Sequence, residues 1–262
     1  RNWFQRAELL ESQYLDWDNL EPHIPFMQDS ADMIDFPDLY QRLSGRYYGE
    51  ASTVFYFNVS TNGHQLYVNG PRQQKYPYYP VGSRKFRTTM GHQARFEMDE
   101  AGNPIAVNGL EPGGRAYRLS YIHSALDAAR ESLIEFDYAS AQTQFAEVPE
   151  AYQKGWLYEA VQNAIIFDAD EVAMDWDSFV GEFRDDKESG VEIFNENGRL
   201  YAVLLGNRNL DRFPIFQINE SDFVNMNYLG RTLRMIRQGE RLVAIEIMYP
   251  DKESLKFNRV PS

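Results

Sequence analysis

Tyrosine rings and amide side chains cluster in residues 73–80, the stretch whose residue types best suit contact with a ligand. Such rings can stack on the face of a sugar or of a peptide ring. If the stretch is a strand, Tyr76 and Tyr78 share one face and Tyr79 points to the other. Tyr67, on the expected hairpin before it, completes the set of predicted ligand-binding residues. Cross-strand aromatic packing is the competing interpretation of this cluster, and we favour it.

Carboxylates offer a second kind of chemistry. Residues 168–177 alternate acidic side chains as a calcium site does, but they lack the Gly at position six and the Glu at position twelve of a calcium loop. A solvated connector or a helix start is therefore the better interpretation. Glu97 and Asp99 are the candidate carboxylates for an enzyme whose acid and base lie at the mouth of a barrel.

Metal-ligating residues are few and scattered. The four histidines stand in no spacing that a metal site uses: His23, His64, His92 and His123. His64 and His92 fall at expected turns. Cysteine is absent, which excludes disulfides, thiolate catalysis and cysteine-ligated zinc or iron–sulfur clusters. The sequence therefore predicts no metal and no cofactor, and it identifies no catalytic residue.

Composition indicates a folded, acidic protein. Hydrophobic residues make up 43% and aromatic residues 15% of the 262 positions, enough buryable surface for one large domain or two ordinary ones. Asp and Glu outnumber Lys and Arg by 39 to 26, so the chain as a whole repels phosphate backbones and nucleic acid is not an expected partner. No apolar run approaches the roughly 20 residues of a membrane span.

Local patterns predict short strands separated by turns. Apolar residues at helical spacing in residues 2–15 predict an N-terminal helix, and the prolines of residues 16–38 predict an extended connector. Further along, Asn62-Gly63 predicts a tight hairpin, because both residue types tolerate positive φ. Short strands with a turn signal about every 8–12 residues are typical of a meander, a sandwich or a small barrel.

The second half of the chain repeats the order of features in the first. Leu43-Ser-Gly45-Arg-Tyr47 corresponds to Phe179-Val-Gly181-Glu-Phe183, and matching turns and strands follow each of them. The matched residues are Gly45 and Gly181, Gly63 and Gly198, Phe86 and Phe223, and Gly102 and Gly239, which lie 136, 135, 137 and 137 residues apart. The matched features follow in the same order and at nearly the same separation, which predicts two copies of a β unit.

Apolar residues three and four positions apart in residues 122–136 predict a helical connector between the copies. The predicted domains are an N-terminal helix and connector (1–35), a first β unit (36–121), a helical connector (122–173) and a second β unit (174–262).

Each copy resembles the lipocalin-like accessory domain found C-terminal to bacterial and archaeal serine hydrolases of the penicillin-binding-protein and beta-lactamase-related class. The shared features are a Leu-x-Gly-x-Tyr strand, a Leu-Tyr pair on a hairpin, a strand containing Pro, an aromatic strand and an Asp-x-x-Gly turn. In the first copy they are Leu43 to Tyr47, Leu66-Tyr67, Tyr79-Pro80, Phe86, Ala94 to Phe96, and Asp99 to Gly102. The second copy departs at the last turn, where Arg237-Gln-Gly239 replaces Asp-x-x-Gly.

The resemblance implies a mainly β protein with two lipocalin-like, antiparallel, barrel-like units of eight strands each. Such units serve assembly or shield an active site contributed by another domain. The associated hydrolases use a Ser-x-x-Lys nucleophile, and no Ser of this sequence has Lys three residues later. A Gly-x-Ser-x-Gly nucleophile turn is absent as well.

We therefore expect a non-catalytic binding or assembly module of a bacterial, envelope-associated protein. Its expected partners are a small hydrophobic ligand, a peptide or a glycan, a second copy of the chain, or an upstream hydrolase domain. The alternatives are an enzyme with carboxylates at a barrel mouth, such as a hydrolase, and the accessory part of a serine hydrolase. The sequence starts at Arg1 and not at Met, so the compartment stays unknown, with a periplasmic or secreted location placed first.

Overall fold

The computed structural model describes residues 36–49, 56–70, 74–82, 84–89, 91–110, 116–169, 176–187, 189–205, 212–226, 232–249 and 252–261. The helix predicted for residues 2–15 and nearly all of the connector predicted for residues 16–38 lie outside this part of the chain. Within it, no helix is both long and apolar enough to cross a membrane.

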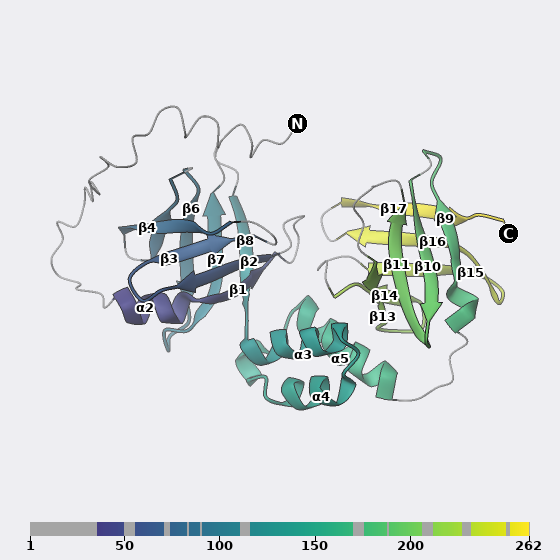
Figure 1. Ribbon diagram of the computed structural model, residues 1–262, viewed down its shortest axis with the longest axis horizontal. Helices are drawn as coiled ribbons and strands as arrows, with labels where there is room; N and C mark the ends of the chain where they lie inside the picture. Colours follow the sequence, from purple (N-terminus) through teal and green to yellow (C-terminus); the bar gives the residue numbers. More distant parts are fainter. Residues whose placement is uncertain are drawn as a thin grey trace. The chain divides into compact units, whose positions relative to one another are not determined.

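Eight strands form a closed barrel in the first half of the chain, each beside the next in sequence (Figure 1). The barrel closes where the last strand pairs with the first and Tyr47 lies opposite Tyr121. The strands are β1 (Gly45–Tyr48), β2 (Tyr56–Thr61), β3 (Leu66–Asn69), β4 (Tyr76–Gly82), β5 (Lys85–Arg87), β6 (Gln93–Met98), β7 (Pro104–Leu110) and β8 (Ala116–Ile122).

Nine strands form a nearly closed sheet in the second half, in the order β12-β11-β10-β9-β17-β16-β15-β14-β13 (Figure 1). The strands are β9 (Gly181–Arg184), β10 (Gly190–Glu196), β11 (Arg199–Leu205), β12 (Phe213–Pro214), β13 (Phe216–Gln217), β14 (Asp222–Val224), β15 (Thr232–Gln238), β16 (Arg241–Tyr249) and β17 (Lys252–Arg259). The outermost strands, β12 and β13, are separated only by Ile215, whose N–H donates to the carbonyl oxygen of Leu200. One bent segment thus pairs with β11 on one side and with β14 on the other.

The strands of the two sheets follow the same order, once one divided strand in each is taken into account. In the first barrel, β4 is likewise divided, since Tyr76 to Tyr78 pair with β3 and Tyr79 to Gly82 pair with β5. Counting β12 and β13 as the counterpart of β4 makes the strand orders of the two halves identical. The predicted fold class is confirmed: the chain is mainly β, with two antiparallel barrel-like units and helices between them in sequence.

Both Asn-Gly sequences lie in hairpins, as predicted for Asn62-Gly63, but their turns differ. Asn62-Gly63 lies in a four-residue loop between β2 and β3, in which the Asn62 side chain accepts hydrogen bonds from the backbone of His64 and Gln65. Only Gly63 of this loop has positive φ. Asn197 and Gly198 both have positive φ, at 56° and 76°, and join β10 directly to β11 in a two-residue turn.

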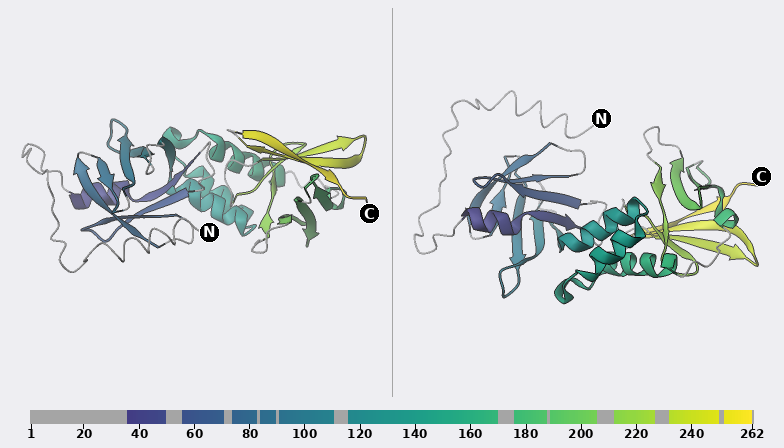
Figure 2. Two further views of the ribbon diagram at one scale, coloured as in Figure 1. Left: turned by 90° about the horizontal axis from the view of Figure 1, so that it is seen from above. Right: turned by 60° about the horizontal axis from the view of Figure 1, so that its bottom comes forward.

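Three α-helices follow the first barrel and lie side by side (Figure 2). They are α3 (Ser124–Ile134), α4 (Tyr138–Ala146) and α5 (Trp156–Ala169), with a short 3-10 helix, η1 (Glu150–Tyr152), between the last two. The stripe predicted in residues 122–136 buries Leu126, Ala129 and Leu133. These side chains join one apolar core with α5 and with Phe216 of β13. Burial of this stripe is what holds the helices against the second sheet.

The chain divides into two compact units, Arg1–Ser44 with Phe57–Arg118, and Gly45–Tyr56 with Leu119–Ser262. The second unit contains β1, the three helices and the whole second sheet. Inside this unit, Arg130 of α3 is 4% exposed and donates to Asp127 on its own helix and to the carbonyl oxygen of Met226, just after β14. This buried guanidinium links the helices to the second sheet.

A short helix precedes each barrel's first strand and packs on a buried phenylalanine. In the first barrel it is α2 (Phe36–Leu43), where Tyr40 contacts Phe86 with ring centres 6.1 Å apart. In the second it is η2 (Trp176–Phe179), where Phe179 contacts Phe223 at 5.1 Å. Phe86 and Phe223 are the matched pair of the predicted repeat, and both are at most 1% exposed.

Candidate ligand groove

The four predicted ligand-binding tyrosines do not share one face of the sheet. Tyr78 is buried, with ring centres 6.1 Å from Phe86 and 6.5 Å from Phe96, and Tyr76 points the same way two residues before it. Tyr67 lies opposite Pro77, so it faces outward, as does the 42% exposed Tyr79. The structure brings Tyr78 into aromatic packing, and a role for these residues in ligand binding stays a prediction.

The two candidate carboxylates, Glu97 and Asp99, both accept hydrogen bonds from other residues of the first barrel. Glu97 accepts a hydrogen bond from Arg118 at 2.9 Å and another from Asn108. Asp99 closes the turn between β6 and β7 by accepting from the backbone and the side-chain amide of Asn103, bonds that lower the pKa of its carboxyl. Each therefore already has a structural role.

Histidine and acidic side chains build no metal centre in the described part of the chain, where no group of three potential ligands comes together. His123 is instead the N-cap of α3, with Nδ1 accepting the N–H of Ala125 and its ring 5.1 Å from that of Tyr152. Of the predicted acidic stretch, residues 170–175 lie outside the described residues. Asp177 accepts from the side-chain amide of Asn195.

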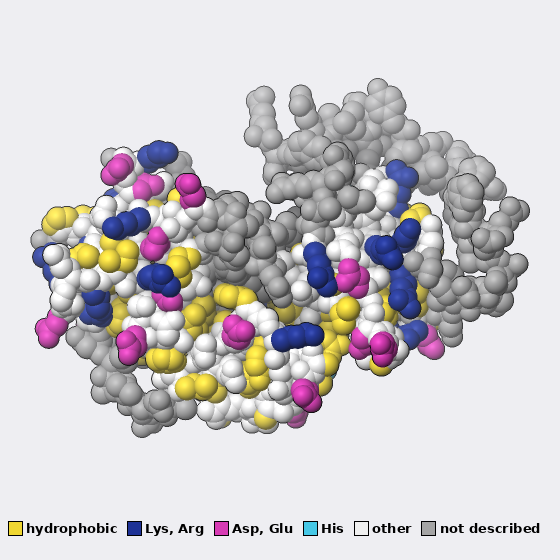
Figure 3. Space-filling model, turned by 180° about the vertical axis from the view of Figure 1, so that it is seen from behind, with side chains coloured by type: hydrophobic (Ala, Val, Ile, Leu, Met, Phe, Trp, Pro, Cys, Tyr) yellow, Lys and Arg dark blue, Asp and Glu magenta, His cyan; other side chains and the backbone are white. Residues whose placement is uncertain are grey.

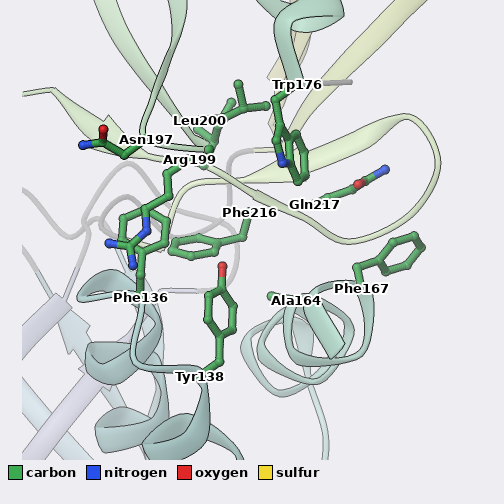
Figure 4. Close-up of a pocket in the computed structure, with 12 residues that line it drawn as sticks. Phe136, Tyr138, Ala164, Phe167, Trp176, Asn197, Arg199, Leu200, Phe216 and Gln217 are labelled. Atoms are coloured by element: carbon green, nitrogen blue, oxygen red, sulfur yellow. The ribbon is translucent and has the colours of Figure 1, made fainter. Parts of the chain in front are cut away.

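An open groove of about 170 Å³ lies within the second unit, between the helices and the second sheet (Figure 4). Its lining residues come from the end of α3, from α4 and α5, from η2, and from the β10–β11 hairpin and β13. They are Phe136, Tyr138, Ala164, Phe167, Trp176, Asn197, Gly198, Arg199, Leu200, Ile215, Phe216 and Gln217. Five of the twelve are aromatic, so the groove offers ring faces and edges as well as polar groups to a ligand.

Phe136 and Phe216 form one aromatic wall, with ring centres 5.3 Å apart. Phe216 is anchored in the apolar core, while the hydroxyl of Tyr138 points toward its ring (Figure 4). Phe136 adopts φ of 59° immediately after α3, a conformation that a bulky residue rarely takes and that glycine usually supplies at this position. The backbone therefore holds a strained residue here, as binding sites often do.

Arg199 gives the groove its positive charge. Its guanidinium lies 4.2 Å from the centre of the Phe136 ring, and the side chain is exposed to solvent. The neighbouring turn fixes this position, because the Asn195 side chain accepts the N–H of Gly198 and the turn admits only residues that tolerate positive φ. A ligand in the groove would meet a cation at its outer edge.

Gln217 supplies a polar group to the lining of the groove. The residue is 7% exposed, and its amide nitrogen donates to the carbonyl oxygen of Asn219 at 2.8 Å. This bond fixes the side chain and leaves its amide oxygen as an acceptor. Trp176, whose ring centre is 6.2 Å from that of Phe179, lies between Phe216 and Gln217 in the view of Figure 4. The groove thus combines aromatic walls with one cation and one fixed amide.

Sequence reasoning did not identify this groove. Its residues lie in five separate stretches between residues 136 and 217, and none of them forms a motif by itself. Two local patterns touch the groove without predicting it. Asn197-Gly198 is typical of the turn before Arg199, and Phe136 is the last residue of the predicted helical stripe.

No protein-family model matches the chain, and no curated protein matches it. Among solved structures, the chain is similar to a Nostoc punctiforme protein with unknown function from the DUF3598 family. The sequences are 10% identical, and the alignment covers 87% of this chain and 100% of that chain with a TM-score of 0.21. A likeness at this level carries no argument about function.

Proposed function

We propose that the protein is a non-catalytic binding module whose groove holds a single ring bearing a negatively charged group. The observation that carries this proposal is the placement of Arg199 beside the aromatic wall of Phe136 and Phe216. A benzoate-like molecule and the C-terminal aromatic residue of a peptide both have this chemistry. The lipocalin-like accessory domains that the two barrels resemble suggest the context, a supporting module within a larger bacterial envelope protein.

The size of the groove favours one ring. Cavities that hold drug-sized ligands have volumes of about 300–1,000 Å³, whereas a cavity of about 150 Å³ accommodates benzene. At about 170 Å³ the groove fits a ring with one substituent. Offset or edge-on contact of a ligand ring with Phe136 and Tyr138 would contribute about 0.5–1.5 kcal/mol per pair beyond the area buried.

The charge of the site favours an anionic substituent. Arg199 presents a planar guanidinium, which binds a carboxylate through two parallel hydrogen bonds. Its position over the Phe136 ring restrains the side chain before any ligand arrives, so less conformational freedom is lost on binding. The chain carries a formal charge of −13, so an anion would be repelled by most of its surface and attracted to few places.

Titration calorimetry with benzoate, benzyl alcohol and methyl glucoside tests the proposal. We expect benzoate to bind more tightly than the uncharged benzyl alcohol and methyl glucoside. Arg199→Gln should weaken benzoate binding about tenfold and leave benzyl alcohol unchanged, since a charge-assisted bond is lost. Arg241→Gln is the matched control, because Arg241 is an exposed arginine of the same sheet that does not line the groove.

Three results would overturn the proposal. One is the absence of benzoate binding at 10 mM, about the weakest affinity worth calling a site. The second is equal loss of affinity in the Arg199 and Arg241 variants. The third is steady turnover of ester or amide substrates by the chain, which would show that the protein is an enzyme.

A further inference from the structure

The outer face of β5 and β6 in the first barrel carries exposed cations, away from the groove proposed above. Lys85 and Arg87 of β5 and Arg95 of β6 all point outward, because the buried residues Phe86, Ala94 and Phe96 alternate with them. A row of Lys and Arg side chains is visible on the right-hand part of the surface in Figure 3.

Two of these cations lie directly opposite each other, Lys85 on β5 and Arg95 on β6. Like charges at directly opposed positions of an antiparallel pair are destabilising. Among the described residues, neither Lys85 nor Arg87 nor Arg95 forms an ion pair. Glu97, two residues from Arg95 on the same face of β6, accepts hydrogen bonds from Arg118 and Asn108, so the described residues give the two opposed cations no carboxylate of their own.

The second barrel shows that the fold does not require this repulsion. Its corresponding strands, β14 and β15, place Asp222 opposite Arg234, with the carboxylate accepting from Nε at 2.8 Å and from Nη2 at 3.1 Å. Phe223 of β14 and Phe86 of β5 occupy the same place in the two topologies, so Lys85 is the counterpart of Asp222. The same position holds an ion pair in one barrel and two cations in the other.

The charge of the first barrel also departs from that of the rest of the chain. Residues 36–122 contain 10 basic and 6 acidic residues, whereas residues 123–262 contain 14 basic and 25 acidic residues. An excess of positive charge on one barrel of an acidic chain is a local property, and β5 and β6 carry three of these ten basic residues against one acidic residue, Glu97.

We propose that the outer face of β5 and β6 binds a short acidic polypeptide segment of a partner protein. Lys85, Arg87 and Arg95 would pair with its carboxylates, and the exposed Tyr79, opposite Arg87, would contact its apolar side chains. A short segment is enough, because Lys85, Arg87 and Arg95 lie on two adjacent strands. Exposed charges interact only within a Debye length of about 8–10 Å, so carboxylates further along a partner would add little. Long polyanions and anionic membranes are disfavoured as partners, because the chain as a whole carries a formal charge of −13.

Lys85→Asp is the sharpest test, because it copies the ion pair of the second barrel. The variant should unfold at an equal or higher denaturant concentration than the natural chain, so loss of binding cannot be attributed to misfolding. With fluorescein-labelled hexaglutamate followed by anisotropy in about 50 mM salt, we expect binding by the natural chain and about tenfold weaker binding by the variant. Raising the salt to about 300 mM should weaken binding by the natural chain as well.

Lys256→Asp is the matched control, since Lys256 is an exposed lysine of β17 in the second barrel and the charge change is the same. It should leave hexaglutamate binding unchanged. The proposal is overturned if both variants weaken binding equally, if hexaglutamate does not bind at low salt, or if duplex DNA or phosphatidylserine vesicles bind more tightly than the peptide.

Discussion

Tyr121 lies directly over Gly45, so that a Cβ atom added at residue 45 would stand 2.5 Å from Cε2 of the tyrosine ring. The ring of Tyr121 also meets that of Tyr47 edge-on at 5.2 Å. Gly181 has the same relationship with Arg259, whose Nε would lie 3.1 Å from an added Cβ. In both barrels the first strand therefore begins at a glycine, and one side chain of the last strand packs over that glycine.

Gly45→Ala should lower the free energy of unfolding by about 2–3 kcal/mol, because it combines a clash with backbone strain at φ of 151°. Gly181→Ala should cost less, since the flexible Arg259 side chain can move by a few tenths of an ångström. Urea denaturation of both variants measures the difference. Equal costs at the two sites would contradict the role assigned to the Tyr121 ring.

Arg130→Met should destabilise the second unit by about 3 kcal/mol, because it leaves the carbonyl oxygen of Met226 without its donor and Asp127 with one cation fewer. Arg46, 24% exposed in its side chain, also pairs with Asp127 at 3.1 Å. Arg46→Met is the comparison, with an expected cost of about 1 kcal/mol. Denaturation curves that rank the two variants in the reverse order would show that Arg130 does not link α3 to the sheet.

Asp222→Asn should reduce stability by about 1–2 kcal/mol at neutral pH. Burial by itself raises the pKa of Asp222, but hydrogen bonds from Arg234 and Asn219 outweigh it and lower the pKa below its ordinary value. The carboxylate therefore adds stability above pH about 4, and this contribution is lost as the pH falls through the lowered pKa. The loss of stability on acidification should be smaller in the variant, as measured by urea denaturation from pH 6 to pH 3.

His123→Asn should remove part of the pH dependence between pH 7 and pH 5. Burial lowers the pKa of His123, and its Nδ1 accepts the N–H of Ala125, which a protonated ring cannot do. Because the folded pKa lies below the unfolded value of about 6.5, stability is complete above that value and declines as the pH falls below it. Asn keeps the N-cap hydrogen bond without titrating. An unchanged pH slope in the variant would contradict this assignment.

The short strands, the hairpins and the helical connector could be predicted from the sequence because turns and buried faces leave local signals. The Asn-Gly pairs, the alternation around Phe86 and Phe223, and the stripe from Leu126 to Leu133 each report a constraint that acts within a few residues. The register of the strands leaves no such local signal. Tyr67 faces outward because Leu66 and Val68 on either side of it are buried in the barrel, and its pairing with Pro77 depends on how β3 and β4 align.

The groove depends on contacts between distant elements, which local patterns do not specify. Phe136 follows α3, Arg199 follows a turn and Phe216 belongs to a two-residue strand. Their proximity follows from the way the helices pack on the second sheet. The short segment that places the buried Phe216 beside the groove was not predicted either, because no local pattern marks residues 213–217 as two strands.

The most direct test of the proposed binding site is a crystal structure of the chain soaked with benzoate, the ligand of the calorimetric test. We predict difference density for one benzoate in the groove beside Phe136, Tyr138 and Phe216, with its carboxylate within hydrogen-bonding distance of the Arg199 guanidinium. Benzoate density only elsewhere, with the groove empty at full soaking concentration, would contradict the proposed binding site.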